Sequence, residues 1–339
     1  MALGARVLKT GIAVVAALYA SMLLEQSSPV IAAVAAIFAM QPSIYRSWRY
    51  FLEQLQANTL GAAIALLTGM LFSNEPIAIG ITCIIVIMLC LRIKREETIG
   101  LTLVTVIVVM EASGQWDFAA TRFVQIIIGI AAAFLINVIF MPPNPKVQFM
   151  NQIDTVFNRM SLLLRTVISD EMKESAFREE KQALEEGLKS LGDKYKLFEE
   201  ETKKLKKAKY RRSRQIVVYK QLLHTLHKGH EVLEAIESHY FQSTPSAQMD
   251  EAFDKHVEML IKGHEHVLLK FEGKVKPDID DMELMEKKNT QFLHQMMQEF
   301  AGSDEGMRRL SLVAAACYEY GFQIIRLDRL VGHVDKENE

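Results

Sequence analysis

Charged side chains are much scarcer in the first 144 residues than in the rest of the chain, and this imbalance constrains the fold more than any other feature of the sequence. That part holds eight Lys and Arg, seven Asp and Glu and no His, while residues 145–339 hold 31 Lys and Arg, 34 Asp and Glu and all nine His. A membrane-spanning helix needs about 20 predominantly apolar residues. We therefore predict an all-α protein, with a transmembrane helix bundle over residues 1–144 and a soluble helical domain over 145–339. A single-core globular enzyme is excluded.

Uncharged stretches divide the first part into six candidate spans, which cover residues 10–24, 26–45, 54–74, 76–91, 98–110 and 123–145. Three are long enough by themselves, and the three shorter ones need flanking residues to complete a crossing. Basic residues lie before the first stretch and after the second and fourth, whereas the other connections carry acidic residues. The positive-inside rule then places both termini in the cytoplasm. Six spans is the preferred count, and four spans with a re-entrant or interfacial pair is the alternative.

Several short features follow one another in a recognisable order: Lys9–Thr10–Gly11, Met40–Gln41–Pro42, Gly61–Ala62, Arg122, Gly129, Asn137 and Pro142–Pro143. In this order they resemble the bacterial aromatic acid exporter family, which is related to fusaric-acid-resistance proteins, in its short form with a C-terminal helical domain. The resemblance implies a multi-pass protein of the bacterial inner membrane that exports aromatic carboxylates. Longer relatives carry two membrane blocks where this chain has one, which implies a homodimer.

Candidate substrate-path residues lie at the edges of the uncharged stretches and among their neutral polar side chains. Lys9 and Arg122 can pair with a carboxylate in a partly dry vestibule, or they can reach toward lipid headgroups and set the topology. Neutral side chains can line a path or bridge helices through hydrogen bonds. A proline after a polar residue at a span end can free backbone carbonyls to line a cavity. The predicted set is Lys9, Gln41, Pro42, Asn58, Arg122 and Asn137.

Apolar residues at helical spacing predict six helices in the second part, near residues 146–169, 177–205, 210–241, 246–272, 279–300 and 303–333. The second of these carries a heptad-like apolar seam. Two of its seam positions are polar and two glycines interrupt it. An antiparallel bundle is therefore favoured over a long parallel coiled coil.

A basic segment over residues 203–214 holds eight Lys and Arg in twelve positions. Such a cluster can contact anionic lipid headgroups, and the alternative is a solvated helix face. The flanks are acidic and no aromatic side chains interleave for stacking, so nucleic acid is not an expected partner. The lipid-contact candidates are Lys203, Lys204, Lys206, Lys207, Arg211 and Arg212.

Motifs of metal and enzyme sites are missing from the sequence. His224, His227 and His230 repeat every three residues, which carries them around a helix instead of onto one face. No phosphate-binding loop, HExxH pair or nucleophile elbow is present, so we expect neither a metal, a cofactor nor an enzymatic activity. The leading hypothesis is an exporter of small organic anions that works by non-covalent transport. A non-transporting membrane scaffold or sensor and an organic-anion channel stay open as alternatives.

Overall fold

The computed structural model is built of helices, as the sequence predicts. The residues that it describes are 4–23, 29–72, 75–111, 116–140, 144–168, 173–204, 209–240, 243, 246–275, 279–300 and 305–335. Within them the chain forms twelve α-helices, one short 3-10 helix and one π-helical turn. The chain divides into two compact units, which we call the first unit (Met1–Asn144) and the second unit (Pro145–Glu339).

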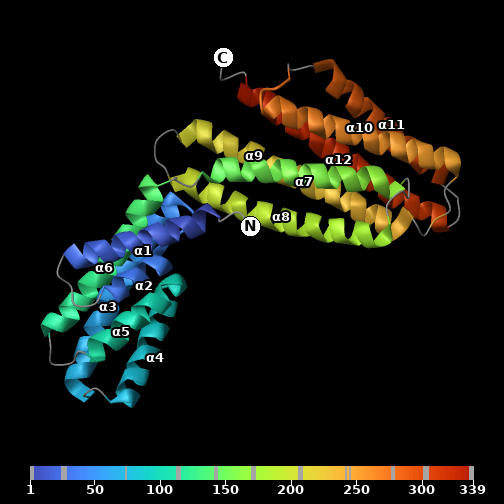
Figure 1. Cartoon of the computed structure of the whole chain (residues 1–339). Helices are drawn as coiled ribbons and strands as arrows, with labels where there is room; N and C mark the ends of the chain where they lie inside the picture. The colour runs from blue at the N-terminus through green and yellow to red at the C-terminus, as the bar shows by residue number, and fades with distance from the viewer. Residues whose placement is uncertain are drawn as a thin grey trace. The chain divides into compact units, whose positions relative to one another are not determined.

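The first unit contains the helices α1 to α6 (Figure 1). Their bounds are Ala5–Leu23 for α1, Val30–Ala39 for α2, Ile44–Phe72 for α3, Pro76–Arg92 for α4, Ile99–Glu111 for α5 and Trp116–Ile139 for α6, with a 3-10 turn at Glu96–Thr98 before α5. By length and composition, α1, α3 and α6 each contain a candidate membrane span, and α2 and α4 are shorter apolar helices. At a rise of 1.5 Å per residue, α2 is only about 15 Å long, half of a hydrocarbon core of about 30 Å. The count of six spans stays a prediction.

Many small side chains are buried inside the first unit together with a few larger ones such as Leu101 and Ile126, and large apolar side chains cover its outside. Ala13, Ala17, Ala32, Ala36 and Ala133 are fully buried. Large side chains are exposed on several helices, among them Leu67, Met70, Leu71, Ile77, Ile84 and Met88. Membrane helices pack in this way because small residues let backbones approach while the lipid solvates the large ones.

α2 and α6 approach each other closely at Gly129. A Cβ atom on Gly129 of α6 would lie 2.1 Å from the Ala32 carbonyl oxygen and 2.7 Å from Ala35 Cβ on α2. Only glycine fits there without moving a helix backbone. α3 packs against α5 and α6, and α1 packs against α2 and α6.

The second unit is a bundle of the helices α7 to α12 (Figure 1). Their bounds are Pro145–Ile168 for α7, Glu174–Lys204 for α8, Lys209–Ala235 for α9, Ala247–Phe271 for α10, Ile279–Phe300 for α11 and Glu305–Asp335 for α12, with a π-helical turn at Ile236–Tyr240 after α9. α12 packs against α9, α10 and α11, and α8 packs against α7 and α9. The apolar seam of α8, including Leu184, Leu191 and Phe198, is therefore buried within its own chain. The predicted helical bundle is confirmed.

Replacing Gly129 with Ala tests the close packing of α2 on α6. We expect a loss of stability of about 1–3 kcal/mol or more, because the added methyl group meets backbone atoms that have no room to yield. The measurement is the midpoint of thermal unfolding of the purified protein in detergent. Gly80→Ala on α4 is the matched control, since a Cβ there meets nothing within 4 Å. Equal midpoints for the two variants would contradict the packing argument.

Candidate functional site

A polar cluster joins the beginning of α1 to the end of α6 and to the connection between α2 and α3. Lys9, near the start of α1, is only 5% exposed, and its Nζ donates a hydrogen bond to Asn137 Oδ1 at 3.2 Å. Asn137, in the last turns of α6, is 1% exposed. The two residues are 128 positions apart in the sequence. Two of the predicted site residues are thus in direct contact.

The orientation of the Asn137 amide is determined by its other partners. Its Nδ2 donates to the Gln41 carbonyl oxygen at 3.0 Å and to Ser47 Oγ at 2.6 Å. A carbonyl oxygen can only accept, so the amide nitrogen has to face Gln41 and the amide oxygen has to face Lys9. The side chain of Asn137 therefore presents an acceptor to the Lys9 ammonium and cannot turn without breaking two hydrogen bonds.

The break between α2 and α3 supplies the carbonyl groups of this cluster. α2 ends at Ala39 and α3 begins at Ile44, and Pro42 lies between them. The carbonyl of Gln41 accepts from Asn137, and the carbonyl of Met40 accepts from Arg6 Nη2 at 3.4 Å. Gln41 therefore contributes its backbone, in line with the expectation that the Gln41–Pro42 step frees carbonyl groups.

Lys9 has no acidic partner among the residues that the structure describes. Its ammonium carries three N–H groups, and its one hydrogen bond there is to the neutral amide of Asn137. A buried charge that is matched only by a neutral dipole is costly. An anion beside Lys9 would offset that cost.

Ser47 belongs to the cluster, although sequence reasoning missed it. It lies in the first turn of α3 and is 2% exposed. The sequence signal that could have found it is its position one helical turn after Ser43, whose Oγ accepts from the Arg46 backbone N–H at the start of α3. Two buried serines on one side of a helix start are uncommon without a polar neighbour.

Asn58 lies in a different polar group, between α3 and α5. Its Oδ1 accepts from Thr105 Oγ1 at 2.7 Å, and Gln54 one turn earlier donates to the Thr98 carbonyl and to Thr102 Oγ1 at 3.5 and 3.4 Å. These bonds bridge two helices and none of them reaches Lys9. The placement of Asn58 in a path with Lys9 gains no support from this geometry.

Arg122 is also apart from Lys9. It lies near the start of α6 and its Nη1 donates to Gln125 Oε1 at 3.2 Å. Fifteen residues of helix separate it from Asn137, a rise of about 22 Å. Arg122 and Lys9 therefore cannot hold the same small carboxylate at one time.

Two further features lie on α3 beside the Lys9 cluster. Glu53 is buried and pairs with Arg49 Nε at 2.7 Å and with Arg95 from the turn before α5. The rings of Trp48, Phe51 and Phe134 form an aromatic group with centroids 5.6–6.0 Å apart. Trp48 follows Ser47 in sequence, and Phe134 lies one helical turn before Asn137. The three rings contact one another and come from the same two helices, α3 and α6, that carry Ser47 and Asn137.

Comparison with known proteins places this arrangement in a family. Residues 1–140 match the family model described as aromatic acid exporter family member 1. The UPF0421 protein YgaE of Bacillus subtilis is 33% identical over 340 residues, which cover 98% of this chain and 95% of that protein. The chain belongs to the aromatic acid exporter family. This is a family of membrane exporters and not of enzymes.

Other relatives match only part of the chain. UPF0421 proteins of Oceanobacillus iheyensis and Halalkalibacterium halodurans are each 29% identical, over 157 and 167 residues. These matches cover 45% and 49% of this chain and 45% and 47% of the relatives. The names of these relatives give no substrate. In this family member, every residue of the Lys9 cluster lies within the 140 residues matched by the exporter model.

The predicted lipid-contact residues lie outside the described side chains. This applies to all six of them: Lys203, Lys204, Lys206, Lys207, Arg211 and Arg212. Lipid contact by this segment therefore stays a prediction. Within the part of the chain that the structure describes, no group of three or more His, Cys, Asp or Glu side chains is placed to hold a metal ion.

Two histidines of this exporter family member, His256 and His264, are buried in the second unit. His256 Nε2 lies 3.1 Å from Asn289 Oδ1, and burial lowers the pKa of His256 to about 4. His264 Nδ1 lies 2.7 Å from the Tyr320 hydroxyl and the ring packs edge-on against Phe157. Burial lowers the pKa of His264 to about 3. Both rings are therefore neutral at neutral pH.

Acid should destabilise the second unit through these two histidines. The unfolded chain protonates them near pH 6.5, while the folded chain resists protonation down to about pH 4 and pH 3. The unfolded state therefore binds more protons between these limits, and the free energy of unfolding falls as the pH falls below 6.5, by about 2 kcal/mol per histidine at pH 5.

The measurement is the protection factor of α10 and α12 amides by hydrogen exchange in the full chain, corrected for intrinsic exchange. His256→Gln should remove part of the pH dependence, whereas the exposed His224→Gln should leave it unchanged. Equal protection at pH 7 and pH 5 in the unaltered protein would refute the prediction.

Proposed function

We propose that this member of the aromatic acid exporter family moves small aromatic carboxylates out of the cytoplasm without covalent chemistry. The observation that supports this most directly is Lys9, a buried cation that has only a neutral amide beside it among the described residues. In the proposed step, the carboxylate of the substrate accepts hydrogen bonds from the free N–H groups of Lys9. Asn137 holds the ammonium in place, and Gln41 and Ser47 hold Asn137.

The distribution of charge supports a cytoplasmic position for this site. Lys9 lies at the end of the first unit where α1 begins, α3 begins and α6 ends. That end also carries the basic residues Arg6, Arg46, Arg49, Arg92, Lys94 and Arg95. With positive residues inside, this end faces the cytoplasm and both termini lie there. Substrate then enters from the cytoplasm, where a cell would accumulate it. The basic residues at this end of the unit attract anions toward Lys9.

The aromatic group beside the cluster supports a substrate with a ring. Trp48, Phe51 and Phe134 offer flat apolar surface on the two helices that also carry Ser47 and Asn137. Ring pairs in offset or edge-on contact gain about 0.5–1.5 kcal/mol beyond their buried area. An inorganic anion would gain nothing there. An aromatic carboxylate uses both the ammonium and the rings.

A homodimer in the inner membrane is part of this proposal. The exposed apolar side chains of the first unit provide surface for lipid and for a second copy of the chain. The family resemblance, in which longer members carry two membrane blocks, also favours a dimer of this short form.

Neutralising Lys9 should abolish transport. We expect Lys9→Gln to slow uptake of labelled benzoate into proteoliposomes by about tenfold or more, because a charge-assisted hydrogen bond is worth about 1.5–3 kcal/mol. The matched control is Lys94→Gln, which removes one positive charge from an exposed position at the same end of the unit. Transport by Lys9→Gln at the rate of the control would show that Lys9 does not hold the substrate. No transport by the unaltered, folded protein would favour a scaffold instead.

Giving Lys9 an acidic partner should also abolish transport, without removing the lysine. In Asn137→Asp, the new carboxylate occupies the ammonium and competes with the substrate. We expect uptake to fall as far as in Lys9→Gln. The Gln41 carbonyl loses its donor, so folding is checked by size-exclusion chromatography and by the unfolding midpoint. A folded Asn137→Asp protein that transports at the normal rate would exclude pairing of the substrate with Lys9.

A further inference from the structure

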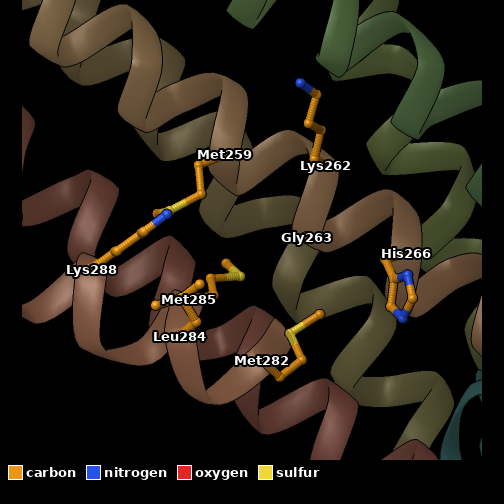
Figure 2. Close-up of a pocket in the computed structure, with 8 residues that line it drawn as sticks. All are labelled: Met259, Lys262, Gly263, His266, Met282, Leu284, Met285 and Lys288. Carbon is orange, nitrogen blue, oxygen red and sulfur yellow. The ribbon is translucent and has the colours of Figure 1, made fainter. Parts of the chain in front are cut away.

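A cavity in the second unit, far in sequence from Lys9, combines thioether side chains with basic ones. It lies between α10 and α11 and has a volume of about 290 Å³. Its lining consists of Met259, Lys262, Gly263, His266, Met282, Leu284, Met285 and Lys288 (Figure 2). Ligand sites in proteins usually occupy about 300–1,000 Å³. This cavity is just below that range, which suits a ligand with a single ring.

The apolar side chains that line the cavity range from buried to exposed. Met282 and Met285 are buried, Met259 is half-buried and Leu284 is 50% exposed. Methionine sulfur makes favourable contacts with aromatic rings, and its flexible side chain adapts to their shape. A flat apolar body would therefore pack against the three sulfur atoms better than a sugar or a phosphate would.

The charges on the lining are all basic. None of the eight lining residues is acidic. Lys262 is paired with Glu258 at 3.4 Å and points away from the cavity in Figure 2. Lys288 extends from α11 toward Met259 on α10 in the same view. In the described part of the chain Lys288 has no acidic partner within 4 Å. Its ammonium is thus available to an anionic group of a ligand that rests on the methionines.

Because Gly263 has no side chain, Met285 has room to pack against α10. A Cβ atom at this position would lie 2.4 Å from Met285 Sδ and 2.9 Å from Met285 Cε. Met285 therefore packs directly on the backbone of α10. A side chain at position 263 would push the end of Met285 aside, and the free space beside it is the cavity.

We infer that this cavity is a binding site for a small organic anion with an aromatic or similarly flat apolar body. The anionic group pairs with Lys288 and the apolar body packs on Met259, Met282 and Met285. This site is separate from Lys9 and goes beyond the proposed transport function. Its ligand chemistry follows from the lining and does not depend on whether Lys9 carries substrate.

The test uses the full chain in lipid nanodiscs with methionine methyl groups labelled with ¹³C. Benzoate is the probe, acetate supplies the charge without the ring, and benzyl alcohol supplies the ring without the charge. We expect benzoate to shift the methyl signals of Met282 and Met285 in a saturable manner, and the other two compounds to bind more weakly. Signals are assigned with single Met→Leu variants.

Lys288→Gln should weaken benzoate binding about fivefold, the upper end for a partly exposed charge pair. The neighbouring Lys287→Gln is the matched control, since Lys287 is exposed and does not line the cavity. Gly263→Ala should weaken binding as well, by moving Met285 into the cavity. Lys287→Gln and Lys288→Gln with the same affinity, or no saturable shift at Met282 and Met285, would overturn the inference.

A variant outside the cavity separates this inference from the proposed function. Lys9→Gln should keep the shifts at Met282 and Met285 even where transport is lost. If Lys9→Gln removes these shifts and Lys288→Gln does not, the cavity is not the binding site and the transport proposal is unaffected. If the shifts persist in the unaltered protein and in Lys9→Gln, weaken in Lys288→Gln, and the unaltered protein does not transport, the transport proposal fails and the cavity stands.

Discussion

The amide of Asn137 is the contact on which the candidate site depends. The residue is 1% exposed and uses both ends of its side chain: the oxygen accepts from Lys9 on α1, and the nitrogen donates to Gln41 and Ser47. Four parts of the chain meet there, namely α1, the connection from α2, the first turn of α3 and the end of α6. In a bilayer no water replaces such bonds, so polar groups must find partners within the protein. A single amide therefore sets the position of the Lys9 ammonium.

Close packing of small residues makes that meeting possible. Gly129 lets α6 approach α2 so closely that a methyl group would overlap the Ala32 carbonyl. α6 also packs against α1 through this part of the unit, where Ala13 and Ala17 are fully buried. Asn137 lies two helical turns after Gly129, on a helix whose distance from α2 is already set. The hydrogen bonds of Asn137 then fix one relative position of these helices among those that the apolar packing allows.

The sequence predicted the helical character of the fold because charge distribution and apolar spacing are local signals. It also singled out Lys9 as a cation at the edge of an uncharged stretch, and Gln41 and Asn137 as neutral polar side chains within such stretches. It could not show that these three meet, since 128 residues separate Lys9 from Asn137 and no local pattern records helix pairing. For the same reason Asn58 and Arg122 were grouped with them, although they bond elsewhere.

Ser47 and Glu53 were missed for a related reason. A serine between two larger residues is typical of an exposed helix start, and a glutamate four residues after an arginine is typical of a solvated helix face. Both become site residues only through partners from other helices. The methionines around the α10–α11 cavity are a similar case, because apolar residues at helical spacing predict burial and do not predict the space left between two helices.

The contrast between Lys9 and other cations of the chain gives the strongest physical reason to assign it a ligand. Lys270, in the second unit, is buried to 6% exposure and is paired with Asp328. Arg49 and Arg95 share Glu53. In these places the chain supplies the acid that a cation needs when it leaves water. At Lys9 it supplies an amide, held so that only its oxygen can face the ammonium. A carboxylate from the chain would have satisfied Lys9 permanently, whereas an amide stabilises the lysine and leaves its charge for an anion that arrives and departs.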